Sequence, residues 1–160
     1  MARTLNKEKR KRGVLANSLS EEILVKIVQY LKENINPSSG EPFLTTVKRK
    51  SGKFYRCNMS CIKDAKGNDK WPQKDLTRFG FRHKVLVHHI WWRYENSFAP
   101  IPDGLDISHL DADHQVLRLV AESRDVNESR KYCHLFKWYK PLPGEPRPRC
   151  PHWNNPCSGP

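Results

Sequence analysis

The chain has 160 residues, enough for one compact domain with a modest core, and 29% of them are charged, with a net charge of +12. Such an excess of positive charge indicates a polyanionic partner, either nucleic acid or an anionic membrane surface. No apolar run reaches the ~20 residues needed to cross a bilayer, and the N-terminus lacks the apolar core of a signal peptide. We therefore expect an intracellular protein with no membrane partner.

The first 16 residues contain the basic run KEKRKRG and little apolar content. This composition predicts a flexible tail over residues 1–16, followed by a single domain over residues 17–160. The basic run has two compatible interpretations. It is a solvated tail, or it is a nuclear-import signal or an arm that contacts the DNA backbone, and the second interpretation predicts a nuclear protein.

The stretch SLSEEILVKIVQYLKENINP predicts the first helix. Ser18 and Glu21 have the spacing of a capping box, and Pro37 follows the end of the helix. The apolar residues recur at helical spacing, which indicates an N-terminal packing helix with no chemistry of its own. These residues are Ile23, Leu24, Ile27, Val28 and Leu31.

Residues 43–93 predict an antiparallel sheet. FLTTVKRKSGKFYRCNMSC fits a hairpin that turns at Ser51-Gly52. DLTRFGFRHKVLV alternates, with apolar residues on one face and Arg78, Arg82 and Lys84 on the other. A strand of this kind fits a DNA groove, although a solvated sheet face gives the same pattern. HHIWWRYE is compatible with a helix or with a further strand.

A strand–strand–helix unit is predicted over residues 104–133. IPDGLDISHL indicates a turn at Asp103-Gly104 and a strand that ends near His109. QVLRLVAES indicates a second strand, and DVNESRKYC resembles the start of a helix.

The final segment, residues 133–157, predicts a zinc loop. It contains CPHWNNPC, a C-x-H-x4-C pattern that follows Cys133. Three thiolates and one imidazole make a closed tetrahedral structural zinc site, here Cys133, Cys150, His152 and Cys157. A loop rich in Pro and Gly has no core to fold around, so metal binding would supply its folding free energy. The alternative is free thiols on a disordered tail. His134 could substitute for a ligand, but its position directly after Cys133 disfavours it.

These elements together resemble the His-Cys box homing endonucleases, a branch of the ββα-metal nucleases. The resemblance is carried by SHL, by LRLVAESRDVNESRKYC and by C-x-H-x4-C, and it covers roughly residues 54–157. It extends upstream to LTRFGFR. It implies an α+β fold, namely a small zinc-stabilised ββα-metal domain with an antiparallel DNA-binding sheet.

The resemblance also implies roles for single residues. His109 matches the general base, which takes a proton from the attacking water. Asn127 matches the single protein ligand of a catalytic Mg²⁺. Arg78 matches the arginine that stabilises the charged phosphate, although an arginine that only contacts the DNA backbone fits the position too. Further DNA contacts are expected from Lys74, Arg82 and Lys84.

The chain departs from the family at a second zinc site. Cys57 matches its first ligand, but Arg118 stands where a histidine is expected. The site is either rebuilt from Cys57, Cys61, His114 and Asp111, or it is lost.

Two functions follow as hypotheses. The first is a Mg²⁺-dependent, site-specific endonuclease that cuts double-stranded DNA as a homodimer. The second is a non-catalytic, zinc-stabilised DNA-binding protein on the same scaffold.

Overall fold

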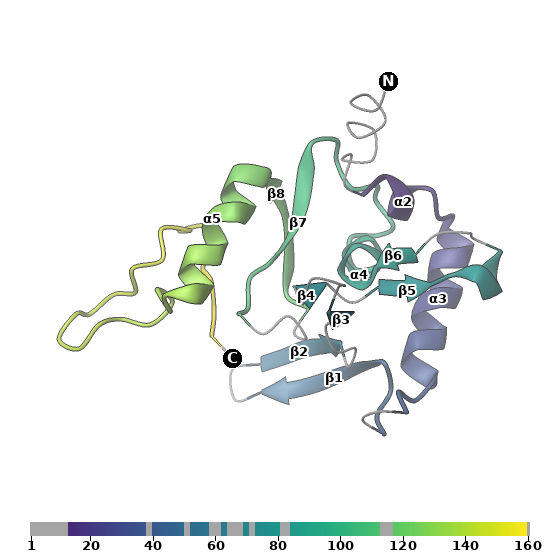
Figure 1. The fold of residues 1–160 in the computed structure, drawn as a ribbon, viewed down its shortest axis with the longest axis horizontal. Helices are drawn as coiled ribbons and strands as arrows, with labels where there is room; N and C mark the ends of the chain where they lie inside the picture. Colours follow the sequence, from purple (N-terminus) through teal and green to yellow (C-terminus); the bar gives the residue numbers. More distant parts are fainter. Residues whose placement is uncertain are drawn as a thin grey trace.

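The computed structural model describes residues 13–37, 40–49, 52–57, 62–63, 69–70, 73–80, 84–112 and 117–159, with backbone alone for the parts of these ranges between 46 and 75 and for Lys84. It is a small mixed α and β fold (Figure 1). In chain order its elements are α2 (Val14–Asn17), α3 (Glu21–Glu33), β1 (Leu44–Arg49), β2 (Gly52–Cys57), β3 (Ile62–Lys63), β4 (Asp69–Lys70), β5 (Gln73–Asp75), the 3-10 helix η1 (Thr77–Phe79), β6 (Lys84–Leu86), α4 (Val87–Glu95), β7 (Leu105–His109), β8 (Leu119–Ser123) and α5 (Arg124–Leu135).

Helix α3 is the predicted packing helix, and its apolar stripe is confirmed. Leu24, Ile27 and Leu31 are completely buried. The predicted cap at Ser18 is wrong, because the helix begins two residues later. Ser20 is the N-cap, and its hydroxyl accepts a hydrogen bond from the backbone N–H of Ile23 at 3.3 Å. Ser18 instead donates to the carbonyl of Val14.

The core lies where α3 meets α4. The segment HHIWWRYE, which the sequence left open between helix and strand, belongs to helix α4. Ile90 and Trp91 are buried against the stripe of α3 and against Leu76. Figure 1 shows α4 between α3 and the β7–β8 hairpin, so the core joins the N-terminal helix to the strand–strand–helix unit.

Arg93 of α4 ties the N-terminal residues to this core. Its guanidinium donates to the carbonyls of Ala16 at 2.7 Å and Leu19 at 2.8 Å, and also to Phe98 at 2.7 Å. Burial lowers the pKa of Arg93. Because Ala16 is fully buried and α2 begins at Val14, the folded unit includes the last residues of the segment expected to be a flexible tail.

The strand predicted over residues 75–87 is interrupted, so that prediction is wrong. Strand β5 ends at Asp75, η1 follows, and Gly80 has a φ of 77°. A positive φ is readily adopted by glycine and ends the extended run. Strands β5 and β6 pair antiparallel instead. Arg78 therefore lies on a 3-10 turn, and Arg82 is outside the described residues.

Two predicted hairpins are present. Strands β1 and β2 pair antiparallel with Arg49 opposite Gly52, so Gly52, expected in the turn, is the first residue of β2, and Ser51 lies outside the described residues. Strands β7 and β8 pair antiparallel with His109 opposite Leu119. Helix α5 follows β8 directly, and Ser123 caps its first turn. Residues 105–135 therefore form the expected order of strand, strand and helix.

None of the helices in the described ranges has the length and apolar character that a bilayer crossing requires.

Candidate functional site

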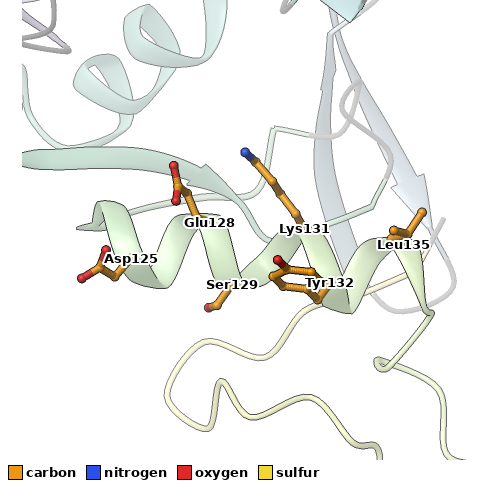
Figure 2. A pocket seen from close by; sticks show the side chains of 6 residues that line it. All are labelled: Asp125, Glu128, Ser129, Lys131, Tyr132 and Leu135. Atoms are coloured by element: carbon orange, nitrogen blue, oxygen red, sulfur yellow. The ribbon is translucent and has the colours of Figure 1, made fainter.

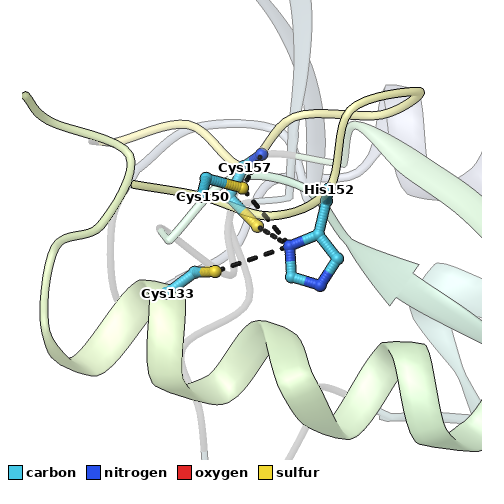
Figure 3. Close-up of side chains that lie close together, drawn as sticks. All are labelled: Cys133, Cys150, His152 and Cys157. Atoms are coloured by element: carbon cyan, nitrogen blue, oxygen red, sulfur yellow. Dashed lines mark hydrogen bonds between the residues drawn. The ribbon is translucent and has the colours of Figure 1, made fainter. Parts of the chain in front are cut away.

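Three thiols and one imidazole converge between the end of α5 and the final loop (Figure 3). The Nδ1 atom of His152 lies 3.4 Å from Sγ of Cys133, 3.3 Å from Sγ of Cys150 and 3.6 Å from Sγ of Cys157. The four ligand atoms all lie within 4.8 Å of one another. This Cys3His cluster could hold a metal ion such as zinc, and its donors suit a closed tetrahedral site.

The hydrogen bonds of Ser129 select the ligand atom of His152. The Ser129 hydroxyl donates to the carbonyl of Val126 at 2.6 Å and lies 2.7 Å from Nε2 of His152. Its proton is already used, so the hydroxyl accepts from Nε2–H. The neutral ring then carries its lone pair on Nδ1, the atom that faces the three sulfurs. A hydroxyl partner of this kind fixes the tautomer of a metal-ligating histidine.

The cluster gathers thiols that do not all ionise without a cation. Burial and the neighbouring thiols of Cys157 and Cys150 raise the pKa of Cys133 to about 12. Burial also raises the pKa of Cys157. At Cys150 burial acts in the same direction, but backbone N–H groups of Cys157 and His152 outweigh it and lower the pKa. A divalent cation would favour all three thiolates at once, because its charge offsets their mutual repulsion.

An ion pair connects this cluster to the β7–β8 hairpin. Arg130 of α5 donates Nη2–H to Oε2 of Glu122 at 2.7 Å and a second hydrogen bond from Nε to Oε1. The same guanidinium donates to Sγ of Cys157 at 3.3 Å and to the carbonyl of Asn155 at 2.7 Å. Burial alone would raise the pKa of Glu122, but the hydrogen bonds and the positive charge of Arg130 lower it overall.

The residue after the last cysteine lies beside the end of β7. The backbone N–H of Ser158 donates to the carbonyl of Leu110, and its carbonyl accepts from Ala112, both at 2.8 Å. Arg118 donates to the Ser158 hydroxyl and to the carbonyl of Pro156. The final loop is thus fastened next to His109, and Arg118, at the position where the resemblance implies a zinc-ligating histidine, helps to hold it.

His109 ends β7 on the side of α4. Its side chain is 8% exposed, and its ring centroid lies 4.6 Å from that of His88. His88 in turn lies 4.6 Å from His89. Three imidazoles therefore gather at the end of β7, two of them from a segment to which the sequence assigned no chemistry.

Asn127 belongs to the first turn of α5. Its Nδ2 donates to Oδ2 of Asp106 at 3.0 Å. Within the described part of the chain, this is the one hydrogen bond of the Asn127 side chain. The side chains of His109 and Asn127 therefore have different neighbours. His109 contacts His88 of α4, whereas Asn127 contacts Asp106 of β7.

Arg78 contacts a third region. Its guanidinium carbon lies 4.4 Å from the ring centroid of Tyr30 in α3, and the side chain is exposed. Among the described residues, no hydrogen bond or ion pair joins Arg78 to His109 or Asn127. No hydrogen bond or ion pair joins His109 to Asn127 either, so in the described part of the chain the three proposed catalytic residues have different partners.

The remaining predicted ligands and DNA contacts lie partly outside the described residues. Cys61, Arg82 and His114 are outside them, and for Cys57, Lys74 and Lys84 the backbone alone is described. Within the described ranges, the Cys3His cluster is the one group of three or more Cys, His, Asp or Glu side chains whose ligand atoms lie close enough together to hold a metal ion. The second zinc site stays a prediction.

Helix α5 lines a hollow of its own (Figure 2). Six of its residues form the lining, namely Asp125, Glu128, Ser129, Lys131, Tyr132 and Leu135. Tyr132 is 56% and Leu135 72% exposed. One helix supplies the whole lining, and Ser129, which contacts His152, is part of it.

Sequence reasoning missed three residues that contact the candidate groups. Asp106 contacts Asn127, and His88 contacts His109. Ser129 contacts His152. A signal for Asp106 was present, because an acidic residue in an otherwise buried strand requires a partner.

In the comparisons with known proteins, no family model, no curated protein and no solved structure matches this chain.

Proposed function

We propose that this chain is a Mg²⁺-dependent DNA endonuclease of the ββα-metal type, similar to the His-Cys box enzymes. The observation that carries the proposal is the β7–β8–α5 unit, with His109 at the end of its first strand and Asn127 in the first turns of its helix. The Cys3His cluster closes the same unit, as the resemblance implies.

The proposed roles follow from the donor atoms. Asn127 would supply an amide oxygen to Mg²⁺, an ion that prefers oxygen ligands and keeps several waters. When bound, the cation would stabilise negative charge on the phosphate and the leaving oxygen. His109 would accept the proton of the attacking water, and for this its imidazole must be neutral. Arg78, exposed on η1, would contribute positive charge to the phosphate.

Double-stranded DNA is the proposed partner because the net charge is +12. The β5–β6 hairpin carries Lys74 and Lys84, and Arg82 lies in the connection between the strands. Contacts of this kind are mainly to phosphates and position the duplex without reading its sequence. Cutting both strands requires two active sites, so we further propose a homodimer, and the basic N-terminal run suggests a nuclear protein.

The test is plasmid cleavage by zinc-loaded protein with and without added Mg²⁺. Mg²⁺ is omitted rather than chelated, because a strong chelator would also remove zinc. We expect nicked and linear products from the wild type, and a loss of ~10²–10⁴ in single-turnover rate for His109→Ala. Asn127→Ala should be partly restored by excess Mg²⁺. Asn96→Ala, at the exposed end of α4, is the matched control.

The second candidate is a DNA-binding protein that does not cut. One observation favours it, namely that Arg78 lies against Tyr30 and not against His109. Binding that weakens with salt, without cleavage in Mg²⁺ of a target selected from random DNA, would establish this candidate in place of the nuclease.

A further inference from the structure

The side chain of Asn127 is held by a buried carboxylate. Asp106 lies in β7 and is 5% exposed, and its Oδ2 accepts a hydrogen bond from Nδ2 of Asn127 at 3.0 Å. The two residues are 21 positions apart, so the contact exists because α5 folds back along β7.

This contact decides which end of the amide is presented. An asparagine has one end that donates and one that accepts, whereas an ionised carboxylate only accepts. Asp106 therefore selects the NH₂ group, and the carbonyl Oδ1 of Asn127 is directed elsewhere. Within the described part of the chain, Oδ1 accepts no hydrogen bond.

The opposite orientation would prevent cation binding. A divalent cation is bound by oxygen, and an NH₂ group pointing at it would be repelled. Glu122, which faces Asp106 across the hairpin, does not compete for the amide because Arg130 holds both of its oxygens. Of these two facing carboxylates, Glu122 is therefore bound to the guanidinium of Arg130, and Asp106 is bound to the amide of Asn127.

We propose that Asp106 is a positioning residue, which orients the amide of Asn127 so that Oδ1 faces a divalent cation. The proposal rests on the proposed function of the same site. A partner of this kind, one shell away from the ion, affects metal affinity without touching the metal.

The test measures cation binding separately from cleavage. Mn²⁺ is titrated into zinc-loaded protein with bound DNA and followed by electron paramagnetic resonance, for Asp106→Asn, Asn127→Ala and the double variant. An amide at position 106 presents either end, so the orientation of Asn127 is no longer selected. We expect a Mn²⁺ Kd raised by about tenfold to 100-fold for Asp106→Asn. In the Asn127→Ala background the same change should not raise the Mn²⁺ Kd further, because the proposed effect of Asp106 on the cation passes through the amide of Asn127.

Asp125→Asn is the matched control. It removes the same charge from the first turn of α5, two residues from Asn127, but its side chain is exposed. We expect a Mn²⁺ Kd close to that of the wild type. A comparable loss in Asp125→Asn would mean that general electrostatics explains the effect, and would overturn the proposal. So would equal losses for Asp106→Asn in both backgrounds, which would indicate a merely structural role.

If Asp106→Asn does not fold, the wild type still tests the proposal. The side-chain NH₂ signals of Asn127 are assigned by their absence in Asn127→Ala, and their hydrogen exchange is followed by NMR with Mg²⁺. Slow exchange that persists with Mg²⁺ supports the proposal, and fast exchange on addition of Mg²⁺ overturns it. If the wild type cuts DNA and Asp106→Asn binds Mn²⁺ normally, the positioning role of Asp106 is refuted and the proposed nuclease function stands. A wild type that does not cut, with the expected Mn²⁺ losses, would refute the nuclease and support the role of Asp106.

Discussion

The N-terminal helical region and the C-terminal loop are ordered by different means. Between α3 and α4, Leu24, Ile27, Leu31 and Ile90 are completely buried, and apolar contact accounts for the packing. In residues 136–159, the one buried residue is Cys157. Burial of apolar area is the main favourable term in folding, so this loop lacks what the helices have.

The difference teaches where a metal ion is needed. The loop holds six prolines, so few of its backbone groups can form regular structure. They are Pro141, Pro143, Pro146, Pro148, Pro151 and Pro156. What it has instead is the Cys3His cluster, with Arg130 and Ser129 reaching it from α5. We infer that a cation replaces the missing core in the loop, whereas the helical region is independent of it.

The largest expected effect is the loss of a metal ligand. Cys150→Ala should abolish tight zinc binding, because structural zinc sites contribute roughly 10–16 kcal/mol at neutral pH. Hydrogen exchange measured by mass spectrometry should become fast in residues 136–159 and stay slow in α3 and α4. Trp153→Ala is the control, since its side chain lies in the same loop and is 82% exposed. Equal loss of protection in α3 would break the comparison, because the two regions would then be one cooperative unit.

A smaller effect is expected where the two regions are joined. Glu122→Gln leaves Arg130 buried without its carboxylate, and breaking a buried pair in this way costs about 3–5 kcal/mol. The exposed pair of Glu128 with Arg124 gives the control, Glu128→Gln, for which we expect about 0–1 kcal/mol. The measurement is the free energy of unfolding in urea, with zinc content checked at each step.

The same pair predicts a pH dependence. The folded-state pKa of Glu122 lies below its ordinary value, so its contribution is fully present above the unfolded pKa of about 4.3 and is lost as the pH falls through the folded pKa. The difference in stability between the wild type and Glu122→Gln should therefore shrink in acid. Using the difference removes the separate effect of acid on the thiolates, which both proteins share. A difference that stays constant down to low pH would contradict this account.

Residue spacing in the sequence predicted the elements whose structure depends on residues close together in the chain. The stripe of α3, the order β7, β8 and α5, and the Cys3His cluster all follow from spacing in the sequence. The strand through Gly80 was wrong because alternation of apolar and basic residues continued across a glycine that turns the chain. The contacts of Asp106 with Asn127 and of His88 with His109 depend on how separate elements pack, and no periodicity encodes them.

The smallest expected effect lies inside the metal region, and it sharpens the comparison by separating the ligands from the groups that orient them. Ser129 does not belong to the Cys3His cluster, but its hydroxyl accepts a hydrogen bond from Nε2–H of His152. The lone pair of Nδ1 is then available to the metal. Ser129→Ala removes this acceptor, and the imidazole can then adopt the tautomer with a proton on Nδ1. Loss of such a partner typically weakens metal binding by about 10- to 100-fold. Competition for zinc with a chelator of known affinity measures the change.

Two controls separate the loss of the hydroxyl from a general effect of changing α5. Lys131→Ala, on the exposed side of α5, should leave zinc affinity unchanged. Ser129→Thr keeps a hydroxyl at the position and should recover most of the affinity. If Ser129→Ala instead binds zinc as tightly as the wild type, then the three thiolates orient His152 by themselves. From α5 the cluster would then depend on Cys133 and Arg130, and not on Ser129.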